Sequence, residues 1–200
     1  LFAIPSFWAT RRWLGKRDAV VLWAILGVYA LLIETSAIYT GFPYGHFGYS
    51  ELLGSKVFAV TPWTVFLAWT PLILGAYAIS RLFIGNSLAR MAAAAIIATA
   101  FDLVLDPGAV RLGFWQYDGS GGFYGVPLSN FGGWLITGSI AALIIEIFLH
   151  YRKPLLPAPV QLISSAFLMV FFWTAIAVFG AMIWPAIIGA ALLGILLVVW

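Results

Sequence analysis

Six apolar stretches, each close to the length that crosses a lipid bilayer, limit what this chain can fold into. They cover residues 19–40, 58–82, 88–106, 131–151, 162–183 and 185–200, the last of them rather short. A helix needs about 20 apolar residues to span the hydrocarbon core. Residues 1–10 are apolar but too few to span, so we expect them to end an earlier helix. The sequence therefore predicts an all-α, polytopic transmembrane helix bundle with about six spans and room for one more upstream.

The composition supports a lipid environment. The chain is 64% hydrophobic and 8% charged, whereas soluble domains average about 45–50% apolar and about 25% charged residues. A soluble fold of 200 residues cannot hide so much apolar surface, and we expect one integral-membrane domain over residues 1–200. The net charge of +3 comes from scattered span flanks and does not indicate nucleic-acid binding. The absence of cysteine excludes disulfides and thiolate nucleophiles.

Basic residues are divided unevenly between the two ends of the predicted bundle. One side carries eight of the ten: Arg11, Arg12, Lys16, Arg17, Arg81, Arg90, Arg152 and Lys153. The other side keeps only Lys56 and Arg111. Because basic loops stay in the cytoplasm, we expect the first set to be cytoplasmic in a cell membrane. Loops 41–57 and 107–130 then lie on the outer side, where we expect them to cap a site.

Three acidic residues, Glu34, Asp102 and Asp106, fall near the outer ends of predicted spans. Asp102 and Asp106 are one helical turn apart and share a face, and Pro107 and Gly108 are expected to end their helix. An ionised carboxylate in hydrocarbon is costly, so such groups face the bundle interior, pair or take up a proton. Two adjacent carboxylates cannot both ionise cheaply, and a protonated member is what acid-initiated chemistry requires.

Structural interpretations stand beside these functional ones. Asp106 would bind backbone amides of a turn or pair with Arg111, and Asn130 would be the N-cap of the fourth span. Glu146, with Arg152 near it, is expected to be structural. Several aromatic residues fit equally well in an interfacial belt, namely Trp63, Trp115, Tyr117, Tyr124 and Trp134.

Residue types that are missing narrow the chemistry. The only histidines, His46 and His150, lie on opposite predicted sides, which rules out a histidine-box di-iron site. No GxGxxG or P-loop indicates a nucleotide, and no lysine lies deep in a span as a retinal Schiff base requires. An oxygen-ligand Mg²⁺ site on Asp102 and Asp106 is an open alternative, although our prediction includes no metal and no cofactor.

Four stretches resemble a known family. They read IETSAIYTGFPYGHFGYS at 33–50, TPWTVFLAW at 61–69, FDLVLDP at 101–107 and GGFYGVPLSNFGGWLITG at 121–138. On these the chain resembles the membrane carotenoid biosynthesis proteins that include the carotenoid 1,2-hydratases and bisanhydrobacterioruberin hydratase. The resemblance implies a hydro-lyase that adds water to the terminal double bond of an acyclic carotenoid without a redox cofactor. Members of this family are usually longer, with a further helix or so upstream.

The residues fit that chemistry. Hydration of a trisubstituted alkene begins with protonation, which gives a tertiary carbocation that water captures. We expect Asp102 or Asp106 to be the proton donor. The other carboxylate and Glu34 are expected to tune the pKa of that donor. Arg111 lies close to Asp106 in the sequence, and we expect it to be a substrate-binding residue of the site whose positive charge would favour the ionised form of Asp106. The candidates for aromatic faces beside the cation are Tyr44, Trp63, Trp115 and Tyr124, and those for holding the water are His46, Tyr117 and Asn130.

Three other functions use the same residues. A lycopene-cyclase-like isomerase shares the acid-initiated cation, and a membrane prenyltransferase uses DxxxD to bind Mg²⁺ and diphosphate. A non-enzymatic, proton-coupled carrier would use the acids as a relay. For the hydratase, the expected partners are an acyclic carotenoid, water and membrane lipid, with no nucleic acid and with a homo-oligomer left open.

Overall fold

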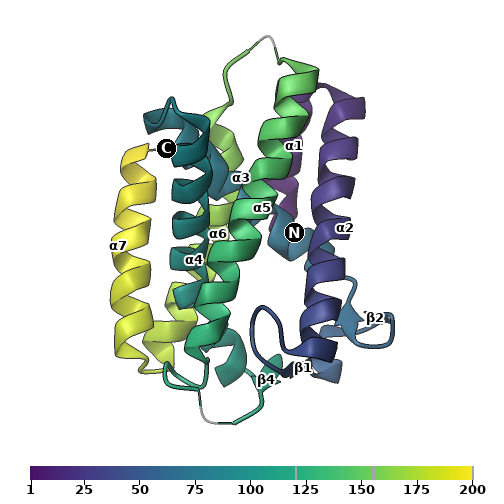
Figure 1. Ribbon diagram of the computed structural model, residues 1–200. Helices are drawn as coiled ribbons and strands as arrows, with labels where there is room; N and C mark the ends of the chain where they lie inside the picture. Colours follow the sequence, from purple (N-terminus) through teal and green to yellow (C-terminus); the bar gives the residue numbers. More distant parts are fainter. Residues whose placement is uncertain (120, 155, 200) are drawn as a thin grey trace.

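The chain forms an α-helical bundle with short strands gathered at one end (Figure 1). The computed structural model describes residues 1–119, 121–154 and 156–199. The helices are α1 (Ala3–Leu14), α2 (Lys16–Thr40), α3 (Val65–Phe83), α4 (Ser87–Arg111), α5 (Leu128–Arg152), α6 (Ser164–Phe179) and α7 (Ile183–Val199). The shorter elements are β1 (Phe47–Tyr49), η1 (Glu51–Leu53), β2 (Lys56–Val57), β3 (Thr61–Pro62), β4 (Trp115–Tyr117) and η2 (Val160–Ile163).

Helices α2 to α7 run alternately up and down between the two ends of the bundle, and α1 packs beside α2 (Figure 1). Four of them, α2 to α5, are long and apolar enough to cross a membrane, as is the continuous segment Val160–Phe179 formed by η2 and α6. The last helix, α7, is apolar but has 17 residues. The predicted all-α membrane bundle is confirmed, including the short final helix.

Several predicted boundaries were wrong. The span expected from Phe58 begins at Val65, because the residues before it form the β2–β3 hairpin. Helix α4 does not end at Pro107 but continues to Arg111. One missing N–H costs a single helical bond, and Gly108 packs against Trp173 and accepts a hydrogen bond from the Leu112 amide. The last turn is therefore held by tertiary packing.

The connection between α4 and α5 is also shorter than expected. Helix α5 begins at Leu128, and its N-cap position is Pro127. The interpretation of Asn130 as an N-cap was therefore wrong, since this residue lies within the first turn. Its buried side chain is turned toward α4 instead. The earlier helix start brings a polar amide into the bundle beside the aspartates.

Helix α3 is the most buried of the long helices, and α4 packs against α3, α5, α6 and α7. Gly138 of α5 lies against the backbone of Ala95 in α4, so these two helices approach closely. Near the opposite end from the strands, Glu146 of α5 forms an ion pair with Arg90 of α4 and accepts a hydrogen bond from Tyr77 of α3. Glu146 thus links α5 to α4 through Arg90 and to α3 through Tyr77. Its ion-pair partner is Arg90 and not Arg152, the residue near it in the sequence.

Two loops are joined by a small antiparallel strand pair at one end of the bundle. Strand β1 pairs with β4 so that Phe47 lies opposite Tyr117 and Tyr49 opposite Trp115. Side chains alternate along a strand, so these four aromatic side chains share the face toward the helices. Gly48 and Gln116 between them are exposed. The strand pair therefore places an aromatic layer over that end of the bundle.

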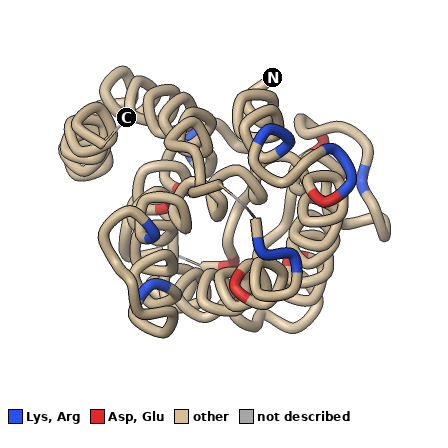
Figure 2. Tube along the Cα trace, turned by 90° about the horizontal axis from the view of Figure 1, so that it is seen from above, with Lys and Arg blue, Asp and Glu red and all other residues tan. Residues whose placement is uncertain are grey.

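The basic residues gather at the other end. The connections α1–α2, α3–α4 and α5–α6 all lie away from the strands (Figure 1), and the eight basic residues identified in the sequence lie in or close to them. Figure 2, seen from above, shows these residues spread over several helices rather than in one patch. This distribution is typical of charges that flank membrane spans.

Candidate active site

A cavity of about 440 Å³ lies beneath the aromatic layer, at the end of the bundle that carries the strands. Helices α2 to α6 and both strands of the β1–β4 pair contribute to its wall. The volume is within the range of small-molecule sites, about 300–1,000 Å³. Most lining side chains are aromatic or aliphatic. The polar groups that converge on it are Glu34, Tyr44, Tyr49, Thr64, Asp102, Asp106, Tyr117 and Asn130.

Asp102 and Asp106 are bridged by a single amide. Nδ2 of Asn130 donates to Oδ2 of Asp102 at 2.7 Å and to Oδ2 of Asp106 at 2.6 Å. All three side chains are almost completely buried, with exposed fractions of 1%, 2% and 2% for Asp102, Asp106 and Asn130. The i, i+4 spacing in α4 sets the two carboxylates on one face, and the first turn of α5 supplies the amide.

The two carboxylates differ in their other partners. Asp106 also accepts hydrogen bonds from Nε1 of Trp115 and, at 2.7 Å, from the hydroxyl of Tyr117. Asp102 accepts only the bond from Asn130 among the described residues. Burial, followed by the charge of Asp106, raises the pKa of the Tyr117 hydroxyl well above its ordinary value, so this group stays a donor. Three donors therefore stabilise negative charge on Asp106, against one on Asp102.

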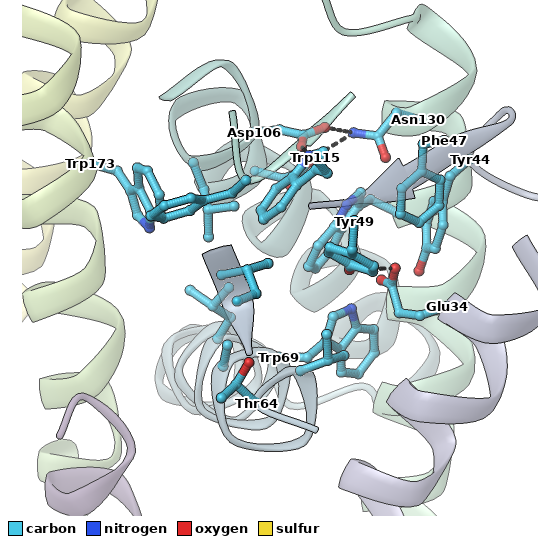
Figure 3. A pocket seen from close by; sticks show the side chains of 18 of the residues that line it. Glu34, Tyr44, Phe47, Tyr49, Thr64, Trp69, Asp106, Trp115, Asn130 and Trp173 are labelled. Atoms are coloured by element: carbon cyan, nitrogen blue, oxygen red, sulfur yellow. Dashed lines mark hydrogen bonds between the residues drawn. The ribbon is translucent and has the colours of Figure 1, made fainter. Parts of the chain in front are cut away.

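The Glu34 carboxylate lies on another part of the cavity wall, separate from the aspartate pair. The Tyr49 hydroxyl donates to its Oε2 at 3.0 Å, and Figure 3 shows this pair apart from the Asp106–Asn130 bond. Burial and the neighbouring Glu34 raise the pKa of Tyr49 well above its ordinary value, which keeps its hydrogen available for Glu34. One turn of α2 thus presents a carboxylate whose second oxygen has no hydrogen bond in the part of the chain described.

Aromatic rings form most of the remaining wall (Figure 3). Trp69 of α3 stacks on Trp134 of α5 with centroids 5.6 Å apart and an interplanar angle of 24°. Tyr49 meets Trp115 edge-on at 5.5 Å across the strand pair. Trp115, Tyr117 and Trp134 therefore line the cavity, where the sequence had also allowed a place in an interfacial belt.

Seven of the residues predicted for the site line this one cavity: Glu34, Tyr44, Asp102, Asp106, Trp115, Tyr117 and Asn130. The other four do not. His46 and Trp63 are exposed, and the Tyr124 hydroxyl accepts a hydrogen bond from the Trp184 amide. Arg111 is carried by the extra turn of α4 to the surface beside Gly180, and it forms no ion pair with the described acids. These four residues are not part of the cavity wall.

Six lining aromatic residues were not selected for the site from the sequence: Phe47, Tyr49, Trp69, Phe114, Trp134 and Trp173. Two of them had a usable signal. In FGY at 47–49 and WQY at 115–117 aromatic residues alternate with small or polar ones, a pattern typical of half-buried strands. Trp69 lies within an apolar span and looks like any other core residue in the sequence.

The chain is similar to known carotenoid biosynthesis proteins. A family model described as "Carotenoid biosynthesis protein" matches residues 1–197. Bisanhydrobacterioruberin hydratase from Haloarcula japonica is 39% identical over 137 residues, which are 66% of this chain and 46% of that protein. The chain thus spans about half the length of the curated relative it matches. No solved structure matches the chain.

Proposed function

We propose that this chain, which belongs to the family of carotenoid biosynthesis proteins, adds water to the terminal C=C bond of an acyclic carotenoid. The observation that carries the proposal is the pair of buried carboxylates with unequal hydrogen-bond support, in the wall of an aromatic cavity. The hydratase among its relatives supports the same reaction class. Hydration balances with alkene and water alone, so the proposal includes no cofactor.

In this proposal Asp102 is the proton donor. Asp106, held by three donors, carries the negative charge, and its charge acts on Asp102 through the shared amide to favour a proton there. The proton passes from Asp102 to the less substituted alkene carbon as the π bond breaks. A tertiary carbocation is left at the other carbon, and Asp102 becomes a carboxylate.

The cavity wall stabilises this cation. Aromatic faces attract a cation, and the stacked pair of Trp69 and Trp134 together with Trp115 and Tyr44 supplies several of them. The buried carboxylates add fixed negative charge in a site of low dielectric constant. Water then forms the new C–O bond and gives its surplus proton to a carboxylate, so the net reaction consumes one water molecule for each end.

The membrane setting fits an apolar polyene. Such a substrate partitions into the bilayer, and the cavity lies at one end of helices that are apolar and long enough to span it. A cavity of about 440 Å³ accepts the end of a long polyene while the rest of the chain extends into lipid. We therefore propose sideways entry of the substrate, with water reaching the cavity from the loop side.

The site also favours hydration over the metal-dependent alternative. A prenyltransferase of the DxxxD type would hold Mg²⁺ between the two aspartates, where a cation needs free carboxylate oxygens. Here the Asn130 amide donates hydrogen atoms to one oxygen of each aspartate. A hydrogen-bond donor at that position suits a pair of carboxylates that shares one proton and one charge.

The decisive experiment is co-expression with a pathway that makes an acyclic carotenoid, followed by mass spectrometry of the pigments. We expect a mass gain of one water molecule for each reacted end. An unchanged mass with a shifted absorption spectrum would mean cyclisation, and unchanged pigment from well-expressed protein would contradict the proposal. Asp118→Asn serves as the matched control for Asp102→Asn, because Asp118 is exposed and does not line the cavity.

A further inference from the structure

We infer that Trp69 and Glu34, supported by Tyr49, hold the water molecule that captures the carbocation. The inference rests on the proposed hydratase function and divides its site in two. The group of Asp102, Asp106 and Asn130 delivers the proton. A second group, here called the water-holding group and made of Glu34, Tyr49 and Trp69, delivers water from another part of the wall.

The first observation is an unpaired donor. Nε1 of Trp69 is buried and has no hydrogen-bond partner, and among the described residues it is the one buried side-chain nitrogen or oxygen in that condition. The side chain as a whole is 4% exposed and lines the cavity. Buried donors are almost always paired in native proteins. A tryptophan N–H in a cavity wall therefore points to a ligand or water oxygen as its partner.

The second observation is that this donor has a fixed direction. The Trp69 ring stacks on Trp134 and meets Tyr29 edge-on with centroids 5.6 Å apart, so packing restricts its rotation. In Figure 3 the Trp69 nitrogen lies on the ring edge that faces the Glu34 carboxylate and Tyr49. An oxygen atom placed between them accepts from the indole and donates to the carboxylate.

The third observation is a free acceptor. Oε2 of Glu34 accepts from the Tyr49 hydroxyl at 3.0 Å, while Oε1 has no hydrogen bond within the described ranges. A water molecule has two hydrogens and two lone pairs. It can accept from Nε1 of Trp69, donate to Oε1 of Glu34 and keep a lone pair for the cation. The water-holding group therefore matches the hydrogen-bonding capacity of one reactive water.

The chemical step balances without another reactant. The water oxygen forms the C–O bond with the tertiary cation, and one of its O–H bonds breaks as the proton moves to Oε1 of Glu34. Glu34 then releases a proton to solvent, and Asp102 regains one. Since protonation and water capture use different carboxylates, loss of the water-holding group should leave the first half of the reaction intact.

An assay in heavy water measures protonation of the alkene and capture of water separately. In D₂O an intact acid group transfers deuterium to the alkene, and a cation that is not captured loses a hydrogen and returns as deuterated, unhydrated carotenoid. Trp69→Phe keeps the ring and removes only the N–H. We expect its hydration rate to fall at least about 10-fold, while deuterium still accumulates in recovered substrate. Trp63→Phe is the matched control, because Trp63 is exposed and outside the cavity.

The outcomes distinguish this inference from the proposed function. Hydration by Trp69→Phe at the rate of Trp63→Phe would overturn the water-holding role. Loss of both hydration and deuterium exchange in a monodisperse Trp69→Phe protein that binds carotenoid would also overturn it. Tyr49→Phe, which removes only the hydroxyl that supports Glu34, is a second variant for which we expect exchange without hydration. An absence of both activities in the wild-type protein would instead contradict the hydratase proposal.

Discussion

At the scale of single residues, Asn130 determines how the aspartate pair behaves. Its amide has two hydrogens and donates one to each carboxylate, so neither hydrogen is left for another partner. The remaining donors, from Trp115 and Tyr117, both go to Asp106. The pair is therefore asymmetric although the two aspartates lie one turn apart on the same helix. In the proposed mechanism, this asymmetry distinguishes the proton donor from its charged partner.

Asp102→Asn and Asp106→Asn should consequently differ in effect. Asp102→Asn keeps the shape of the side chain but removes the acidic proton, so we expect hydration to fall on the order of 10²–10⁴-fold. Asp106→Asn removes a charge that supports the donor and should cost less. Initial rates on carotenoid in liposomes measure the difference. Two monodisperse variants with rates near wild type would show that the aspartates do not supply the proton, and a reversed order would assign the donor to Asp106.

The sequence was informative about some of these residues and not about others. Glu34, Asp102 and Asp106 could be selected because acids within membrane spans are rare and costly. The roles of Tyr49 and Trp69 could not be predicted, since both depend on contacts between distant segments. Tyr49 lies opposite Trp115 in the β1–β4 pair and donates a hydrogen bond to Glu34 of α2. Trp69 differs from other core tryptophans only by its missing partner, which requires the three-dimensional surroundings.

At the scale of elements, the loops depart most from the prediction. Apolar windows located the helices, but they did not predict the strand pair, the extra turn of α4 or the early start of α5. Each of these is stabilised by partners far away in the sequence, such as Trp173 against Gly108. Local propensity at Pro107 favoured a helix end, and packing opposed it. The element ends that shape the cavity are thus set by tertiary contacts.

Gly133 and Gly132 offer a direct test of how α5 positions the 41–49 loop. A Cβ on Gly133 would lie 2.5 Å from the Tyr44 ring and 2.8 Å from the Pro43 carbonyl oxygen, whereas one on Gly132 would meet nothing within 4 Å. We expect Gly133→Ala to lower stability by about 1–3 kcal/mol through overpacking and to reduce hydration by displacing Tyr44. Gly132→Ala should keep full activity and gain up to about 1 kcal/mol of helix stability.

Thermal unfolding in detergent, with hydration rates measured on the same preparations, compares the two variants. Because the substitutions are identical and adjacent, general effects of alanine in this helix cancel. Equal melting temperatures and equal rates would mean that the loop does not depend on its close contact with α5. A loss confined to Gly132→Ala would place the critical contact on the lipid-facing side instead.

At the scale of the whole molecule, most of the basic residues and the cavity lie at opposite ends of the bundle. Eight basic residues lie around the connections at one end, and the cavity with its aromatic layer lies at the other. The apolar helices between them leave large aliphatic and aromatic side chains exposed on the outside of the bundle, as expected for a surface in lipid. In the proposed function, a substrate that arrives through the bilayer and water that arrives from the loops would meet at the same cavity.

The charge division predicts the orientation in the membrane, with the cavity toward the outer side. The chain has no cysteine, so single cysteines report accessibility without background. Gly85, between α3 and α4, and Gly122, between β4 and α5, both have open space around an added Cβ, so substitution should not disturb packing. In intact cells an impermeant thiol reagent should label Gly122→Cys. Gly85→Cys should be labelled only after the membrane is permeabilised.

The expected difference in labelling between Gly122→Cys and Gly85→Cys in intact cells follows from the membrane barrier. A charged reagent does not cross the hydrocarbon core, so the labelling of a cytoplasmic thiol in intact cells should stay near that of the cysteine-free protein. Equal labelling of both variants after permeabilisation is the control for reactivity. If Gly85→Cys is labelled in intact cells and Gly122→Cys is protected, the orientation is reversed. The cavity would then draw its water from the cytoplasm, although the aspartate pair and the water-holding group would be unchanged.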